Sequence, residues 1–74
     1  MTPKQYRTRI EALGCPSGAA WARFVGIDRG AHTRHLMGVE HRNGRKIPKT
    51  LIIVLGWLES GDLKNPWLEN DDFS

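Results

Sequence analysis

The stretch SGAAWARFVGIDRGAHTRHLMG, residues 17–38, has the pattern of two short helices joined by a tight turn. Ala22 stands four residues before Gly26, and Ile27 and Asp28 follow before a second helical segment. A small residue allows two helices to cross closely, and glycine tolerates the positive φ angle that a tight turn requires. This order is typical of a helix-turn-helix, whose second helix enters the major groove of DNA.

The segment before this stretch carries the signals of another helix. Thr2 can cap it, Pro3 suits the first helical position, and Gln5 can complete a capping box. Gly14 then stops the helix. Its apolar stripe, and with it the first part of the predicted core, consists of Tyr6, Ile10 and Leu13.

Similar signals bound the later helices. Ser17 caps a helix that runs to about residue 25, and Asp28 caps the next one, over about 29–37. Pro48 opens a fourth helix that reaches about Glu59, and one more turn is expected over residues 63–68. The chain therefore predicts an all-α fold, a compact four- to five-helix bundle that contains the helix-turn-helix.

The fourth helical segment, PKTLIIVLGWLE, is ambiguous by composition. Its β-branched residues would suit a buried strand, but its length and leading proline favour a helix. As a helix it is apolar almost all round, with Leu51, Leu55 and Leu58 on one face. A small domain covers only one side of such a helix, so a second copy of the chain is expected on the other side. The predicted dimer contacts are Ile52, Ile53 and Trp57.

Size and cysteine content indicate one small domain without disulfides. The 74 residues divide into a helix-turn-helix domain, residues 1–61, and a short acidic extension, residues 62–74. In that extension, Trp67 either folds back on the body or packs across a dimer. A single cysteine and the absence of an N-terminal hydrophobic segment favour the cytoplasm, of a bacterium or of a phage-infected host cell.

Charge is distributed unevenly along the chain. Residues 1–50 hold ten lysines or arginines against three acidic residues, a formal charge of +7. Residues 51–74 hold one lysine against five acidic residues, a formal charge of −4. A basic body with an acidic end suits a surface that binds a polyanion, with the end facing solvent or a partner.

Metal-dependent and catalytic functions find little support in the residues. His32 and His35 lie one helical turn apart, and Cys15 and His41 are the other candidate ligands. Zinc sites usually present a closer pair on each side, such as CxxC, and none occurs here. No arrangement of nucleophile and base, and no glycine-rich phosphate loop, stands out. We therefore expect no metal, no cofactor and no enzymatic activity.

From Thr2 to Glu59, the order of these elements resembles the small helix-turn-helix regulators of the Cro and phage-repressor superfamily. The residues that carry the resemblance are the TPKQYR start, the A-x-x-x-G-[IV]-D motif at residues 22–28 and the proline-led apolar helix. Anti-CRISPR-associated autorepressors share this arrangement. The resemblance implies a lambda-repressor-like bundle whose recognition helix spans about residues 29–37.

The resemblance also implies roles for individual residues. The start of the second helix would face a DNA phosphate, through Ser17 and Gly18. The outer face of the recognition helix would contact bases, through Arg29, Gly30, Thr33 and Arg34. The following loop would hold phosphates and set the register, through Arg42, Arg45 and Lys46.

At three positions the chain departs from the family pattern. Gly18 stands where glutamine is frequent, and His32 and His35 stand where apolar residues are usual. Histidines that face the interior are held neutral by burial, so the domain is expected to loosen below about pH 6.

Two functions from different classes follow. The first is a sequence-specific repressor of transcription that binds double-stranded DNA, acts as a homodimer on an inverted repeat, regulates its own promoter and needs no small-molecule effector. The alternative is a protein-interaction module of the antitoxin or phage-adaptor type, with DNA binding secondary or absent. The acidic end and the apolar fourth helix favour the alternative, and the arginines of the recognition helix favour DNA.

Overall fold

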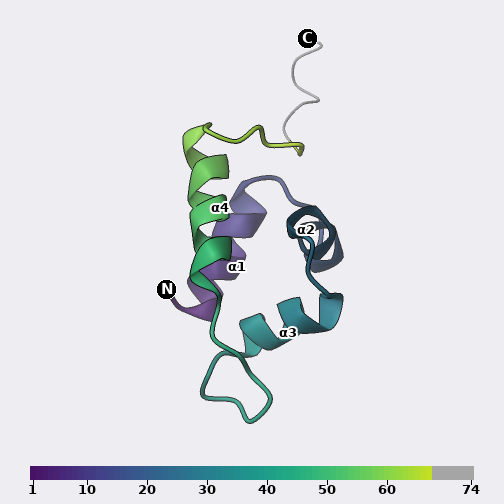
Figure 1. Cartoon of the computed structure of the whole chain (residues 1–74), viewed down its shortest axis with the longest axis vertical. Helices are drawn as coiled ribbons and strands as arrows, with labels where there is room; N and C mark the ends of the chain where they lie inside the picture. Colours follow the sequence, from purple (N-terminus) through teal and green to yellow (C-terminus); the bar gives the residue numbers. More distant parts are fainter. Residues whose placement is uncertain (68–74) are drawn as a thin grey trace.

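The helices of the computed structural model begin and end close to the cap residues that the sequence provides. The structure describes residues 1–67. In this part of the chain it contains four helices and no strand: α1 (Pro3–Ala12), α2 (Gly18–Val25), α3 (Arg29–Met37) and α4 (Lys49–Ser60). Figure 1 shows α1 and α4 near each other, α2 on one side and α3 across one end. The predicted all-α bundle is confirmed.

Local hydrogen bonds explain where the first two helices start. Thr2 Oγ1 accepts from the N–H of Gln5 at 3.1 Å, and Gln5 Oε1 accepts from the N–H of Thr2 at 2.9 Å, so the capping box is complete. At α2, Ser17 Oγ accepts from the N–H of Ala20 at 3.1 Å. Gly26 ends α2 with φ 81°, a backbone conformation that strongly favours glycine.

Two predictions about element ends were wrong. Asp28 occupies the N-cap position of α3, but its side chain makes no capping hydrogen bond. Only its backbone carbonyl accepts, from the N–H groups of Ala31 and His32 at 3.0 and 3.1 Å, while one carboxylate oxygen lies near Gly30. The extra turn expected over residues 63–68 is also wrong for residues 63–67, which form no helix, and Leu68 lies outside the described residues.

The core centres on a buried aromatic pair. Tyr6 and Trp21 have no exposed surface, and their rings meet edge to face with centroids 6.2 Å apart. Trp21 Nε1 donates a hydrogen bond to the Tyr6 hydroxyl at 2.9 Å, so both polar atoms of the pair are satisfied. The remaining buried apolar side chains close around the pair, among them Ile10, Leu13, Ile47, Leu51, Leu55 and Leu58. The leucine face of α4 therefore lies inside, as expected for a helix.

The segment after α4 folds back on the body of the same chain. Asn65 Nδ2 donates to the carbonyl of Leu13 at 2.9 Å, across the end of α1. The Trp67 ring lies 6.1 Å from Trp21 and 5.2 Å from Phe24 between centroids. Phe24 is 38% exposed and forms the outer wall of this contact.

α3 packs against both α1 and α2, and the loop that follows it is attached to its C-terminal end. The backbone N–H of Arg45 donates to the carbonyl of Arg34 at 3.0 Å. Gly44 lies directly against the carbonyl of Gly38, where no side chain would fit. In Figure 1 this loop extends beyond α3, at the end of the molecule opposite the segment that follows α4. Among the described residues, no helix is long and apolar enough to cross a membrane.

Candidate nucleic-acid interface

The outer face of α3 brings together the residues that were expected to read DNA. Arg29, Thr33 and Arg34 are exposed, and Gly30 is partly exposed. The pairs 29/33 and 30/34 are each four residues apart, so they stack on neighbouring lines of one helix surface. Thr33 Oγ1 donates to the carbonyl of Arg29 at 3.1 Å, which fixes the threonine methyl and hydroxyl relative to the helix.

The side chains of Asp28 and Arg34 lie over Gly30. A Cβ at this position would lie 3.3 Å from Asp28 Oδ2 and 3.8 Å from Arg34 Nη1. The Arg34 guanidinium therefore folds back along its own helix, over the glycine and toward the carboxylate. The expectation that Gly30 leaves room for a close approach to the backbone thus depends on Arg34 moving outward.

The loop after α3 offers three exposed cations: Arg42, Arg45 and Lys46. The Arg45 guanidinium donates to the carbonyls of Gly44 and Asn43 at 2.9 and 3.5 Å, so it stiffens the loop that carries it. Within residues 1–67, no hydrogen bond or ion pair is found for the side chains of Arg42 and Lys46, which therefore remain available to an anion.

The turn between α2 and α3 depends on small residues. The carbonyl of Ala22, a buried residue, accepts from the N–H groups of both Gly26 and Ile27 at 2.9 Å. Gly18 leaves no room for a side chain, because a Cβ there would lie 2.8 Å from His32 Cδ2 and 3.0 Å from His32 Nε2. The start of α2 thus lies against the imidazole edge of α3, and Gly18 has a packing role besides the expected phosphate contact.

An open groove of about 480 Å³ lies between α1, the start of α2 and α3. Ser17 and Gly18 line it from α2, Arg29 and His32 line it from α3, and Arg7 lines it from α1. The expected phosphate-facing residues and part of the expected base-reading face therefore border the same space. Arg7 was not predicted from the sequence, because its place in the groove depends on how α1 packs, which no local pattern encodes.

The two histidines of α3 are buried, with 5% exposure for His32 and 7% for His35. The Nδ1 atom of each ring is enclosed and has no hydrogen-bond partner. Burial lowers the pKa of His35, and the pKa of His32 is lowered by burial and by the nearby charges of His35 and Arg7. Both imidazoles are therefore neutral at pH 7, as the sequence suggested for interior histidines.

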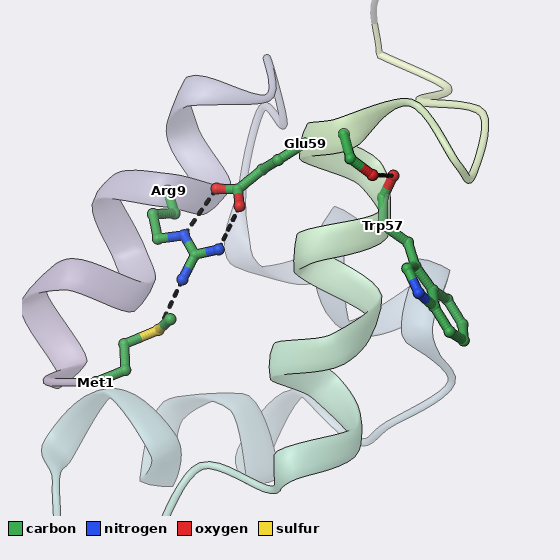
Figure 2. Close-up of polar contacts among 5 residues, drawn as sticks. Met1, Arg9, Trp57 and Glu59 are labelled. Carbon is green, nitrogen blue, oxygen red and sulfur yellow. Dashed lines mark hydrogen bonds and ion pairs between the residues drawn. The ribbon is translucent and has the colours of Figure 1, made fainter.

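Arg9 joins α1 to α4. Its Nε donates to Glu59 Oε2 at 2.7 Å, and a second nitrogen pairs with Glu59 Oε1 (Figure 2). This pair raises the pKa of Arg9 and lowers the pKa of Glu59, chiefly through the side-chain hydrogen bond. Because 50 residues separate the partners, no helix-periodicity argument could have found them.

Two of the three predicted dimer contacts, Ile53 and Trp57, lie on the α4 side that faces away from the core, whereas Ile52 packs against the core. Ile53 is 43% exposed, Trp57 is 49% exposed and Ile52 is partly buried. Figure 2 shows the Trp57 indole on the opposite side of α4 from the Arg9–Glu59 pair. Two large side chains therefore present apolar surface to solvent from one helix.

The surroundings of Cys15 and of the candidate metal ligands indicate packing roles. The Cys15 thiol is buried and donates to the carbonyl of Ser17 at 3.2 Å, and burial raises its pKa, so it stays protonated and unreactive at neutral pH. Within residues 1–67, no three His, Cys, Asp or Glu side chains are grouped to hold a metal ion.

Comparison of the chain with protein-family models, with curated proteins and with solved structures gave no match. The resemblance to the Cro and phage-repressor superfamily therefore remains a prediction from the residues.

Proposed function

We propose that the protein binds double-stranded DNA in a sequence-specific way and represses transcription, that of its own gene included, with α3 as the recognition helix of a helix-turn-helix. The observation that carries the proposal is the outer face of α3. Arg29, Thr33 and Arg34 are all exposed there, while the inward face of the same helix holds His32 and His35. Arginine and threonine are residue types that read guanine edges and thymine methyl groups in the major groove.

The surroundings of α3 support the same function. The basic loop that carries Arg42, Arg45 and Lys46 is bonded to α3 through the Arg45 N–H and the Arg34 carbonyl. Cations held at a fixed place beside a recognition helix contact the phosphates and set the register of the helix in the groove. The start of α2 offers N–H groups to a phosphate on the other side of α3.

Dimerisation completes the proposal. The exposed apolar side of α4, with Ile53 and Trp57 and with the partly buried Ile52 at its edge, would pack against the same side of a second copy. Two-fold symmetry would then present two copies of α3 to half-sites about 34–36 Å apart on an inverted repeat. The protein would act in the cytoplasm of a bacterium or of a phage-infected host cell, without a small-molecule effector.

One observation favours the alternative, a protein-interaction module with DNA binding secondary or absent. Ile53 and Trp57 are close to half exposed, and such side chains suit a foreign helix as well as a second copy. Under this alternative the protein partner would cover α4 while α3 remained free.

The decisive test is the anisotropy of labelled DNA from upstream of the gene, beside a scrambled duplex, at two salt concentrations. Tight binding to the first duplex that survives the higher salt would support a sequence-specific regulator. Equal, salt-sensitive binding to both duplexes would overturn specificity and leave only a basic surface.

Two variants separate the proposed roles. Arg34→Ala should weaken binding to the specific duplex by about 1–3 kcal/mol while non-specific binding changes less. Arg45→Ala should weaken both and lower the slope of log affinity against log salt by about one unit. Lys64→Ala, which removes a charge beyond α4, is the matched control and should change neither. Unaltered specific affinity of the Arg34 variant would refute its base-reading role.

A further inference from the structure

The groove between α1, the start of α2 and α3 has the donor groups of an anion site. α2 leaves two backbone N–H groups without an intrahelical partner. In its first backbone hydrogen bond, the N–H of Trp21 donates to the carbonyl of Ser17, and the N–H of Ala20 donates to Ser17 Oγ. The N–H groups of Gly18 and Ala19 therefore remain at the positive end of the helix dipole, beside the groove.

His32 supplies a second, independent feature that points to a ligand. It is 5% exposed, its Nδ1 is enclosed without a partner, and its Nε2–Cδ2 edge lies against Gly18 in the wall of the groove. A neutral imidazole carries one proton. Because Nδ1 meets no acceptor, the favoured tautomer places that proton on Nε2, where it can meet a ligand. The buried ring thus directs a donor into the groove beside the free amides.

The charges around the groove match an anion. Arg7 lines it from α1 and Arg29 lines it from α3, and within residues 1–67 neither guanidinium forms an ion pair. Among the described residues, Glu11 is the one carboxylate on the wall, and it offsets part of this charge. Cys15 contributes a protonated thiol, whose hydrogen bond already goes to the carbonyl of Ser17. The groove is therefore bordered by two cations and three neutral N–H donors, and by one carboxylate.

We propose that this groove binds a tetrahedral phosphate-type anion, held by the N–H groups of Gly18 and Ala19, by His32 Nε2 and by Arg7 and Arg29. The phosphate comes from one of two sources, a free ion or the DNA backbone. The second source rests on the proposed function, whereas binding of the free ion does not. Around this groove, the sequence predicted a phosphate contact only for Ser17 and Gly18. Arg7 and His32 extend the site, so that α1 and the inner face of α3 also contact the anion.

The test is a titration of the ¹⁵N-labelled chain with inorganic phosphate, against chloride at equal ionic strength and constant pH. Saturable shifts are expected for the amides of Gly18 and Ala19. The amides of Lys49 and Thr50, at the start of α4, serve as an internal control, because no side chain caps that helix and no histidine lines its start. Equal, non-saturating shifts at both helix starts would overturn the proposal.

His32→Leu removes the donor while keeping a buried side chain of similar bulk, and it should weaken phosphate binding at least tenfold. The matched control is His35→Leu, because His35 is also buried on α3 with an unpartnered Nδ1 but lines a different cavity. Arg7→Gln should also weaken binding at least tenfold, since hydrogen bonds to charged groups are worth about 1.5–3 kcal/mol. Unchanged binding by both the His32 and Arg7 variants would contradict the assignment.

A final arm identifies the source. Unlabelled duplex DNA is added to the protein saturated with phosphate, and the Gly18 and Ala19 amides are followed. Displacement of the ion by DNA would assign the groove to a backbone phosphate, and retention beside bound DNA would assign it to a free anion. If the protein binds no DNA, the phosphate titration alone still supports or refutes the site.

Discussion

α2 and α3 are neighbours of eight and nine residues, yet their buried faces have different chemistry. α2 buries Trp21, whose single polar atom donates to Tyr6, and the small Ala22. α3 buries two imidazoles, each with an unpartnered Nδ1. One helix is therefore fully satisfied in the core, and the other carries an energetic penalty on its inner face.

The difference indicates which region is optimised for stability. A buried polar atom without a partner costs about 1–3 kcal/mol, and apolar side chains in place of His32 and His35 would avoid that cost. α3 also carries the exposed arginines of the proposed interface and one wall of the anion groove. Departures from full polar satisfaction are expected at functional sites, so this penalty is consistent with the interface proposed for α3.

The largest loss of stability is expected in α2, whose buried polar atom has a hydrogen-bond partner. Trp21→Ala removes a fully buried ring and leaves the Tyr6 hydroxyl without its donor, so the free energy of unfolding should fall by about 3–5 kcal/mol. Phe24→Ala, on the same helix but 38% exposed, should cost clearly less. Urea unfolding followed by circular dichroism measures both, and equal losses would show that burial does not distinguish them.

The two histidines should make stability depend on pH. Their pKa is lowered in the folded state, so below the unfolded value of about 6.5 the unfolded chain binds protons more readily than the folded chain. Stability is therefore complete above that pH and is lost as pH falls through the lower folded pKa values. The melting temperature should drop between pH 7.5 and pH 5.

Replacing both His32 and His35 by leucine tests whether these histidines cause the loss of stability in acid. The double variant should gain about 1–3 kcal/mol for each orphaned nitrogen removed, and its melting temperature should fall less in acid. His41→Gln is the control, because His41 is exposed and the acid sensitivity should persist without it. A wild-type melting temperature that stays flat from pH 7.5 to pH 5 would refute the whole argument.

The smallest effect concerns the contact that joins the two terminal helices. Arg9 and Glu59 are each about one third exposed, with side-chain exposures of 35% and 33%, so solvent screens their attraction. Removing either side chain should cost about 0.2–1 kcal/mol, and a double-mutant cycle should give a coupling that shrinks as salt increases. A coupling well above that range, unaffected by salt, would show that the pair behaves as a buried one.

Local signals predicted most of the helices. The Thr2–Gln5 capping box, the Ser17 cap and the left-handed glycine at 26 act within a few residues, so a reading of the sequence finds them. Asp28 shows the limit of such signals, because a capping residue type at the right position still made no side-chain bond. The resemblance to helix-turn-helix regulators implied that the arginines of α3 lie on its outer face, and both are exposed.

Tertiary packing decided what no local pattern encodes. It joined Arg9 to Glu59 across 50 residues, folded Trp67 onto Trp21 and Phe24, and turned the His32 edge onto Gly18. These contacts depend on where whole helices lie, whereas periodicity and caps depend only on neighbours along the chain. The sequence by itself thus determined four helices and the apolar stripe of α1 and leucine face of α4 that enter the core. Only the tertiary structure determined that Arg7, Gly18 and His32 share one groove, because they come from three helices.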